Sequence, residues 1–476
     1  MQKRSFACVA LAAFAAAALV GCQKTATSGS SVTSGSTATS TSTAATLPTI
    51  RYLNFKPEIA DAYAGIAEAY KKETGNTVIV DTAASGTYEA TLKAKMPTKE
   101  APALFQINGP VGYANWKEYC ADLTDSDFYK ALTDKTLAVT DAGKAYGVPY
   151  TVEGYGIIYN NAILTKYFAL ANKAVSDTSM ATINTFAKLK ALADDVQAKA
   201  ATLGIDGAFA GTSLKDGEQW RWQTHLFNMP IYGEYGKVSS VQDNFTFKYA
   251  AQYKNVFDMY VNDSGDKKAT LATLDVNASM AEFAMGQCAF VQNGNWAASQ
   301  ILKVEGETVK SDDIKFMPIY SGLDHAGAAA YDETKQGLCV GTENFLSVNK
   351  KLTADEQKAA IAFANWLYTG NGKSYVTKSV TDGGLSFIAP FKDMASPSDP
   401  LSKEVMNWMS KDGVTSVPWD FATIPSENVK NTLGAGLLAY VNGSMTDALW
   451  KSGVVDATTA KWTSEAALLK TSSVAA

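Results

Sequence analysis

The sequence predicts an α/β protein in which mostly parallel sheets carry helices on both faces. Three observations support this class: strand-like and helix-like segments alternate along the chain, 46% of the 476 residues are hydrophobic, and only 19% are charged. The apolar fraction, with 42 basic against 47 acidic residues, is typical of a folded globular protein. At about 100–200 residues per domain, the length indicates two or three domains.

The alternation is clearest in the first part of the folded body. Helical spacing of apolar residues predicts helices at Ala60–Thr74 and Tyr88–Lys95. The β-like runs around them are Arg51–Phe55, Thr77–Asp81 and Leu104–Ile107. Strand–helix–strand units in this order favour parallel pairing, because the helix returns the chain to the same end of the sheet.

Four later helices extend the pattern. They are expected at Ile183–Ala200, at Tyr249–Val261, from Thr353 to about Tyr368, and near Val429–Val441. Thr353 is followed three residues later by Glu356, which is the pattern of a capping box. No repeat of fixed period and no long Pro/Gly linker interrupts this part of the chain. If there are two lobes, the chain is therefore expected to cross between them several times.

The N-terminus has the pattern of a secretory signal peptide, expected at residues 1–21. Lys3 and Arg4 give a positive start, and Phe6–Val20 is an uninterrupted apolar run of 15 residues. As a helix this run would span about 22 Å, which is short of the roughly 30 Å hydrocarbon core of a membrane. We therefore expect an export signal and not a membrane-spanning helix.

Leu19-Val20-Gly21-Cys22 resembles a bacterial lipobox, in which a peptidase cuts before the cysteine and a lipid is attached to its sulfur. Residues 23–46 contain 15 serines or threonines and no apolar periodicity. Residues 22–46 are therefore expected to be a lipidated Cys22 followed by a flexible tether. The resemblance implies an extracytoplasmic protein, lipid-anchored to the cell membrane on the cell surface or the periplasmic side.

Three cysteines remain after Cys8, in the signal peptide, and Cys22 are set aside. Because Cys120, Cys288 and Cys339 are three in number, at most one disulfide can form, and their wide spacing gives no CxxC motif. Buried free thiols are the expected state. The spacing leaves open whether Cys288 and Cys339 pair.

Composition and motifs disfavour catalysis and nucleic-acid binding. The chain has two histidines, His225 and His325, and a net charge of −5, which give neither a His-rich metal site nor a basic footprint. Gly372-Lys373-Ser374 lacks the earlier glycine and the preceding strand of a phosphate loop. Ser347-Val348-Asn349-Lys350 lacks the companion motifs of an S-x-x-K enzyme. We therefore expect no enzymatic activity, no cofactor and no bound metal.

Aromatic residues are abundant, with 9 Trp, 22 Tyr and 20 Phe. Several tryptophans occur in loop-like segments beside amide or carboxylate groups: Trp116, Trp220 with Trp222, Trp296 and Trp419. A flat apolar ring beside polar groups suits a sugar, which presents C–H patches on one side and hydroxyls at its rim. Core packing is the commoner role for any single Trp, but four such clusters favour a carbohydrate site.

Three segments carry a family resemblance. One extends from Gly143 to Asn160, and another, Met280–Trp296, has a helix, a glycine and a strand that ends in Asn293-Gly294-Asn295-Trp296. The third is the ending Leu437–Leu449. Together with the lipobox and tether, they resemble the extracellular solute-binding proteins of the family that includes maltose-binding protein, over nearly the whole chain from Cys22 onward.

The resemblance implies an α/β periplasmic-binding-protein fold, with two lobes, a multi-strand hinge and a ligand cleft between the lobes. It implies an N-terminal lobe of residues 47–151 and 335–381 and a C-terminal lobe of residues 152–334 and 382–476. Independently, ligands of open α/β sheets bind beyond the carboxyl ends of the strands. This rule places the loops after Phe55, Ile107 and Val291 at the cleft.

The resemblance also implies individual ligand-binding residues. Trp296 corresponds to the stacking residue of the second lobe, and Glu153 to a carboxylate of the crossover segment that accepts sugar hydroxyls. Further candidates are polar residues near strand ends and two looser aromatic matches: Asn54, Lys56, Asn108, Asn295, Trp222 or Trp220, and Trp419. After Ile107, Asn-Gly-Pro stands in place of a charged loop, so specificity for linear maltodextrins is not expected.

The implied function is a carbohydrate receptor that captures a sugar, expected to be an oligosaccharide, and closes around it. The closed form would deliver the sugar to the permease of an ABC importer, driven by a separate ATPase. A monomer is expected. Two alternatives stay open: the same fold with a polyamine, metal chelate or peptide as ligand, and a surface glycosidase or adhesin. A glycosidase needs two carboxylates about 5–10 Å apart, and Glu153 is the one carboxylate with an expected cleft position.

Overall fold

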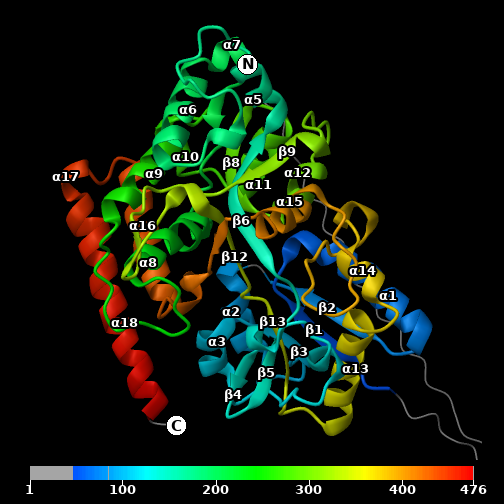
Figure 1. Ribbon diagram of the computed structural model, residues 1–476. Coiled ribbons are helices and arrows are strands. Elements are labelled where there is room, and N and C mark those ends of the chain that lie inside the picture. The colour runs from blue at the N-terminus through cyan, green and yellow to red at the C-terminus, as the bar shows by residue number, and fades with distance from the viewer. Residues whose placement is uncertain (1–46, 84, 475–476) are drawn as a thin grey trace, which may run out of the picture. The chain divides into compact units, whose positions relative to one another are not determined.

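The computed structural model describes residues 47–83 and 85–474 (Figure 1). From Leu47 onward these residues form one compact unit. The expected signal peptide, the lipidation site Cys22 and the tether up to residue 46 lie outside the described residues. Among the residues that are described, no helix is long and apolar enough to cross a membrane.

The first lobe is built on a six-stranded sheet with strand order β2-β1-β3-β13-β5-β4. Its strands are β1 (Ile50–Asn54), β2 (Val78–Thr82), β3 (Leu104–Ile107), β4 (Val139–Asp141), β5 (Lys144–Pro149) and β13 (Phe345–Val348). The three expected strands pair in parallel, with Tyr52 of β1 opposite both Val80 and Leu104. The later strands β13 and β5 run antiparallel to their neighbours.

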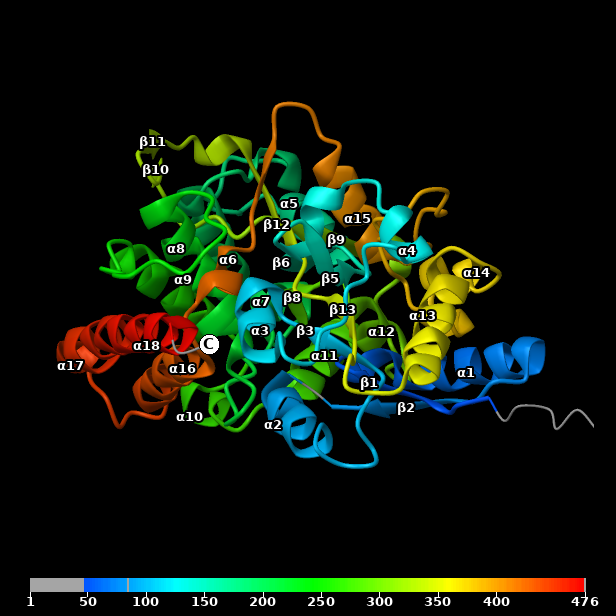
Figure 2. The same cartoon turned by 90° about the horizontal axis from the view of Figure 1, so that it is seen from below.

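Helices cover both faces of this sheet, on opposite sides in Figure 2. They are α1 (Ala60–Thr74), α2 (Ser85–Lys95), α3 (Gly109–Trp116), α4 (Asp127–Lys130), α13 (Ala354–Tyr368) and α14 (Lys373–Thr377). One core contains Tyr63 of α1 and Phe363 of α13, and the other contains Tyr88 of α2 and Trp116 of α3. The expected bounds of α1 and the capping box at Thr353 are confirmed.

The second lobe is built on a sheet with strand order β14-β12-β6-β8-β7, in which β9 also pairs with β6. Its strands are β6 (Glu153–Asn160), β7 (Gly207–Phe209), β8 (Cys288–Gly294), β9 (Ile314–Met317), β12 (Gln336–Gly341) and β14 (Thr415–Val417). A hairpin of β10 (His325–Ala326) and β11 (Ala329–Ala330) lies apart from it. Both large sheets are mixed, not mostly parallel as expected, because strands that return from the other lobe enter antiparallel to their neighbours.

Twelve helices of the second lobe surround this sheet within the described part of the chain. They are α5 (Asn161–Phe168), α6 (Phe186–Ala198), α7 (Ala200–Leu203), α8 (Asn228–Tyr235), α9 (Ala250–Asn262), α10 (Lys268–Leu271), α11 (Val276–Ala284), α12 (Ala297–Leu302), α15 (Pro400–Met409), α16 (Glu427–Val441), α17 (Asp447–Trp450) and α18 (Ala457–Val474). The helices expected near residues 183, 249 and 429 are therefore present with ends shifted by up to three residues.

The chain passes between the lobes three times. It crosses from β5 to β6 through Thr151, from β12 to β13 through Glu343, and again between Phe391 and Leu401. The expected division placed residues 335–381 in the first lobe, but β12 pairs with β6 and β14 in the second sheet. The first-lobe core also extends beyond residue 381, since it includes Phe387 and Phe391. A short apolar run such as β12 suits either sheet, so its sequence does not determine the partner.

Cys120, Cys288 and Cys339 are free and buried, so the possible pairing of the last two does not occur. Cys339 lies on β12 and Cys288 on β8, and β6 separates these strands in the sheet. Burial raises the pKa of the Cys339 thiol to about 12, which keeps it protonated at neutral pH. These thiols are packing groups.

Candidate ligand-binding cleft

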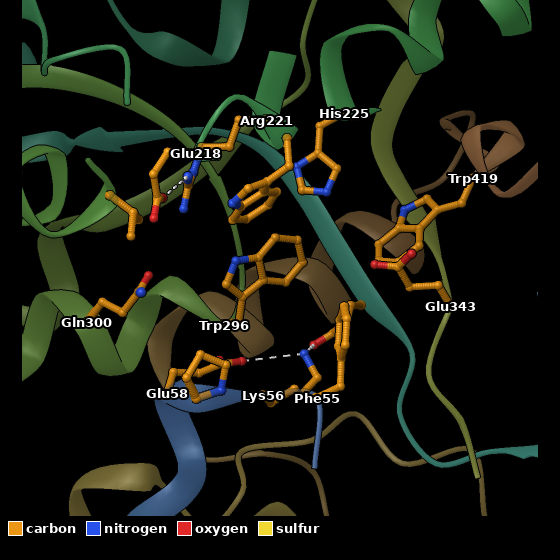
Figure 3. A pocket seen from close by; sticks show the side chains of 14 residues that line it. Phe55, Lys56, Glu58, Glu218, Arg221, His225, Trp296, Gln300, Glu343 and Trp419 are labelled. Carbon is orange, nitrogen blue, oxygen red and sulfur yellow. Dashed lines mark hydrogen bonds and ion pairs between the residues drawn. The ribbon is translucent and has the colours of Figure 1, made fainter. Parts of the chain in front are cut away.

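A cavity of about 160 Å³ lies where the two lobes meet (Figure 3). The first lobe contributes the turn after β1 and the 3₁₀ segment Pro57–Ile59, and the chain crossing after β12 contributes Glu343. The rest of the lining comes from the second lobe. The lining residues are Phe55, Lys56, Pro57, Glu58, Glu153, Glu218, Trp220, Arg221, His225, Val276, Trp296, Gln300, Glu343 and Trp419. A second hollow, of about 400 Å³, shares Phe55, Trp220, His225 and Glu343 with it and extends the site.

An ion pair between the lobes closes one side of the cavity. Lys56 Nζ lies 2.7 Å from Glu153 Oε1 and 3.5 Å from Glu58 Oε1. The other oxygen of Glu153 accepts a hydrogen bond of 2.6 Å from Asn344 Nδ2. Burial acts to lower the pKa of Lys56, but the carboxylates of Glu153 and Glu58 outweigh it and the net shift is upward. Lys56 is therefore a permanent ammonium group in the cavity wall.

Asn54 determines where Lys56 points. At the end of β1, Asn54 Nδ2 donates to the Lys56 carbonyl at 2.7 Å, and the Lys56 amide donates back to Asn54 Oδ1 at 3.1 Å. Such a side-chain turn replaces the next pair of ladder hydrogen bonds and ends the strand. Because Asn54 is fully buried, its role in the structure is to shape the turn that carries Lys56.

Aromatic rings line the cavity beside this ion pair, and Lys56 Nζ lies 5.5 Å from the ring centroid of Trp296. The ring centroids of Trp220 and Trp296 are 6.1 Å apart, and those of Trp296 and Trp419 are 6.5 Å apart at nearly a right angle. The ring of His225 stacks on Tyr155, with centroids 4.1 Å apart. Perpendicular and offset rings present both faces and edges, which is a surface that a sugar ring can contact through its C–H groups.

Two glycines make room for these tryptophans. A Cβ atom on Gly294, at the end of β8, would collide with the ring of Trp296. A Cβ atom on Gly341, at the end of β12, would lie 2.5 Å from Cγ of Trp419. Each ring therefore rests directly on strand backbone. This contact gives a physical reason for the glycine in the Asn-Gly-Asn-Trp segment.

Several polar atoms in the wall have no hydrogen-bond partner among the described residues. Nε and Nη1 of Arg221, Nδ1 of His225 and Nε1 of Trp419 are all buried in this state. Burial and the nearby charge of Arg221 hold the pKa of His225 well below its usual range, so the imidazole is neutral. Burial raises the pKa of Glu343 to about 7. The cavity thus offers neutral and charged donors in a partly dehydrated space, as small-molecule sites do.

Five of the sequence-predicted residues come together around this cavity: Lys56, Glu153, Trp220, Trp296 and Trp419. They come from segments far apart in the sequence, and the turn after β1, the start of β6 and the end of β8 bring them to one place. Whether each of them contacts a ligand stays a prediction.

Four other predicted residues do not line the main cavity. Asn54 shapes the turn after β1, and Asn108 lines only the adjoining hollow. Asn295 is buried and joins backbone of β6 to α15, accepting from the Gly154 amide and donating to Ser402 Oγ. Trp222 is 3% exposed and packs in the second-lobe core.

Trp116, the remaining loop-like tryptophan, ends α3 in the first-lobe core. Trp116 and Trp222 therefore both pack in a hydrophobic core. Arg221–Leu226 is a π-helical segment, in which the residue spacing differs from that of an α-helix. A periodicity of 3.6 residues therefore does not predict which of the rings of Trp220 and Trp222 points into the core.

Sequence reasoning missed six polar residues that line the cavity: Glu58, Glu218, Arg221, His225, Gln300 and Glu343. Their only available signal was closeness to candidates already chosen, as with Glu58 beside Lys56 and Arg221 beside Trp220. In place of one expected carboxylate, four line the cavity, but two of them contact Lys56. In the described parts of the chain, no group of three His, Cys, Asp or Glu residues is arranged to hold a metal ion.

Comparisons with known proteins agree with this geometry. Residues 65–408 match a family described as bacterial extracellular solute-binding protein. No curated protein sequence matches the chain significantly. The family and the similar solved structures are solute-binding proteins and not enzymes, as the sequence predicted.

Many solved structures share the fold. A chitin oligosaccharide binding protein is 19% identical, with a TM-score of 0.65, and the alignment covers 88% of this chain and 98% of that one. A sugar transporter from Bacillus licheniformis in complex with stachyose is 16% identical, with a TM-score of 0.60 and coverage of 88% and 100%. Maltose-bound MalE3 of T. maritima is 15% identical, with a TM-score of 0.60 and coverage of 89% and 99%. At these identities the likeness is one of fold, and it confirms the expected two-lobed architecture.

Proposed function

Since residues 65–408 match that family, the chain belongs to the bacterial extracellular solute-binding proteins, and we propose that it captures a carbohydrate in the cleft between its two lobes. Membership of this family implies action outside the cytoplasm. The observation that carries the sugar assignment is that Trp220, Trp296 and Trp419 line one cavity together with the Lys56–Glu153 ion pair, whose ammonium group lies 5.5 Å from the ring centroid of Trp296. Aromatic rings beside charged hydrogen-bonding groups match the two kinds of surface that a sugar presents.

The size of the site favours an oligosaccharide. The main cavity and the adjoining hollow share four lining residues, so a ligand can extend from one into the other past Trp220 and His225. Similar structures were solved with raffinose, stachyose and maltose, which supports the same ligand class here. The ligand would stabilise the closed arrangement, because it contacts both lobes only when they meet.

The receptor would be held at the membrane by a lipid on Cys22 and would deliver its sugar to the permease of an ABC importer. Cys22→Ser should abolish incorporation of labelled palmitate and release the protein from membranes, with Cys120→Ser as the matched control. Retention of the Cys22→Ser protein on washed membranes would rule out this anchor.

A cationic ligand such as a polyamine is the second candidate function. The observation in its favour is that Glu58, Glu153, Glu218 and Glu343 all line the cavity. Against it, Lys56 already contacts two of these carboxylates, and the raised pKa of Glu343, about 7, leaves that group partly protonated at neutral pH. The fixed cation Lys56 would also repel a second cation.

Thermal melting of the purified protein against a panel of mono- and oligosaccharides tests the assignment, with spermidine and short peptides in parallel. Binding to the native state alone stabilises it by about 2.7 kcal/mol at a ligand concentration one hundred times the Kd. A shift with one class of glycan supports the carbohydrate receptor. A flat carbohydrate panel with a shift for spermidine or a peptide would keep the fold and replace the ligand class.

A further inference from the structure

Arg221 is a buried cation whose hydrogen-bonding capacity is unused. It begins the π-helical segment Arg221–Leu226 and is 1% exposed, yet its Nε and Nη1 atoms have no hydrogen-bond partner within the described chain. Its Cζ atom lies 3.8 Å from the ring centroid of Trp220. Figure 3 shows the guanidinium beside Glu218 in the lining of the cavity. A planar set of N–H donors is therefore held against an aromatic ring in the lining of the cavity.

The charge of this guanidinium is poorly balanced. Its ion-pair partner in the described structure is Glu218, whose Oε2 lies 3.8 Å from Nη1, which is too far for a hydrogen bond. Burial lowers the pKa of Arg221 to about 9 in spite of Glu218, so the group is still charged at neutral pH. A buried charge without a hydrogen-bonded counterion is unfavourable. Such a group is expected where a ligand supplies the missing partner.

The choice of arginine at this position is informative. Of the 42 basic residues only three are arginine: Arg4, Arg51 and Arg221. Lysine would supply a point charge, whereas the guanidinium supplies a planar fork that stacks on an aromatic ring and matches the two oxygens of a carboxylate. Arg221 already uses one face for Trp220, and its N–H edge is left for a planar anion.

Gln300 adds a second polar group to the same region. It projects from α12, lines the cavity, and its Oε1 atom is buried without a hydrogen-bond partner in the described structure. In Figure 3 Gln300 is drawn on the side of the cavity away from Glu343 and Trp419. Because a side-chain amide carries both an acceptor and a donor end, rotation can present its NH₂ group to a ligand oxygen.

We propose that Arg221, assisted by Gln300, binds a carboxylate of the ligand, so that the captured sugar is an acidic oligosaccharide containing a uronic acid. This proposal rests on the carbohydrate function and specifies its substrate class. Hydroxyls of a neutral sugar would fill the donors but leave the charge without a hydrogen-bonded counterion, whereas a carboxylate supplies both acceptors and the opposite charge. The ligand carboxylate would then replace Glu218 as the ion-pair partner of Arg221. Glu218 can be displaced because it makes no hydrogen bond to Arg221.

Isothermal titration calorimetry of the purified protein tests this with matched ligands. The probes are oligosaccharides of galacturonic, glucuronic, mannuronic and guluronic acid, the same molecules with methyl-esterified carboxyls, and their neutral hexose counterparts. We expect one acidic oligosaccharide to bind at least about tenfold more tightly than its ester and its neutral counterpart. A neutral or esterified sugar that binds as tightly as the acid would overturn the proposal and leave the carbohydrate function standing. No binding by any member of either set would overturn both.

Two variants identify the residue responsible. Arg221→Lys keeps the charge but loses the planar pair of N–H donors. It should lower the affinity for the acidic ligand about tenfold or more and change the affinity for a neutral sugar less. Glu218→Gln removes the competing carboxylate and should raise the affinity for the acidic ligand. Arg51→Lys, on β1, is the matched control and should change neither affinity. Unaltered acid binding in Arg221→Lys, or weaker acid binding in Glu218→Gln, would contradict the assignment, and melting curves in the absence of ligand check that each variant is folded.

Discussion

The ammonium group of Lys56 lies 2.7 Å from the carboxylate of Glu153, and this ion pair joins the first lobe to the second at the ligand cavity. Lys56 follows β1, whereas Glu153 begins β6, directly after a chain crossing. The two side chains are only 6% and 5% exposed. Buried partners of this kind depend on each other, because removing one leaves an uncompensated charge in a poorly hydrated place. The ion pair therefore links the integrity of the hinge region to the polar wall of the cavity.

We expect Lys56→Met and Glu153→Gln each to lower the free energy of unfolding by about 3–5 kcal/mol. The double variant should lose clearly less than the sum of the two, because neither unpaired charge is left behind. Urea unfolding of all four proteins gives the coupling energy. The control is the same cycle on Lys190 and Asp194 of α6, an exposed pair, where coupling should stay below about 0.5 kcal/mol. Strict additivity at Lys56 and Glu153 would show that the pair is not coupled.

Substitutions at Trp296 and Trp222 should separate an effect on ligand affinity from an effect on stability. Trp296 lines the cavity and Trp222 lies in the second-lobe core. Trp296→Ala should weaken the ligand found in the sugar panel by about 2–4 kcal/mol, measured by calorimetry, with a small change in melting temperature. Trp222→Ala should instead lower the free energy of unfolding by about 3–5 kcal/mol. Unchanged affinity in a folded Trp296→Ala protein would remove this residue from the site.

Gly294 should affect ligand binding by positioning the ring of Trp296. A Cβ atom at position 294 would collide with that ring, so Gly294→Ala should displace Trp296 and weaken ligand binding by about 1–3 kcal/mol. Gly65→Ala in α1 is the matched control, since nothing lies within 4 Å of the added Cβ, and it should leave affinity unchanged. Quenching of tryptophan fluorescence by the ligand would report whether the ring of Trp296 still contacts it. Equal affinity in Gly294→Ala and Gly65→Ala would show that the contact does not orient Trp296.

Local sequence signals predicted local structure well. The spacing of Tyr63 with its neighbours and the following Gly75 gave the bounds of α1, and Thr353 with Glu356 gave the start of α13. These features depend on residues within one or two turns, which a sequence displays directly. The sheet membership of β12 was wrong, because strand pairing depends on residues far away in the chain.

The candidate site was predictable only where a motif marks it. Trp296, at the end of β8, follows a recognisable glycine-containing turn, and Glu153 lies in the crossover segment. Arg221 and Glu343 carry no such pattern, since the π-helical segment and the crossing after β12 position them through tertiary packing. Asn54 and Asn295 were chosen for the right places in the chain, but their side chains hydrogen-bond to backbone that supports the cavity.

Asp420 should make the stability of the second lobe depend on pH. Its side chain is almost fully buried, Oδ1 accepts from the Val238 amide at 3.0 Å, and Oδ2 has no hydrogen-bond partner among the described residues. Burial raises the pKa of this carboxyl from 3.8 to about 7. Between these two values the folded protein holds a proton that the unfolded chain releases. The free energy of unfolding therefore falls as pH rises through this window, and the loss is complete above about pH 7.

Replacing the carboxyl by an amide should remove this loss. Asp420→Asn keeps the acceptor for Val238 and cannot ionise, so it should raise the free energy of unfolding at pH 8 by roughly 1–4 kcal/mol. At pH 4 the two proteins should differ little, because Asp420 is then protonated in the folded state. Urea unfolding at pH 4, 6 and 8 measures the trend, with Asp412→Asn on an exposed loop as the control. A constant difference between Asp420→Asn and the parent across this range would mean that Asp420 keeps its charge when the protein folds.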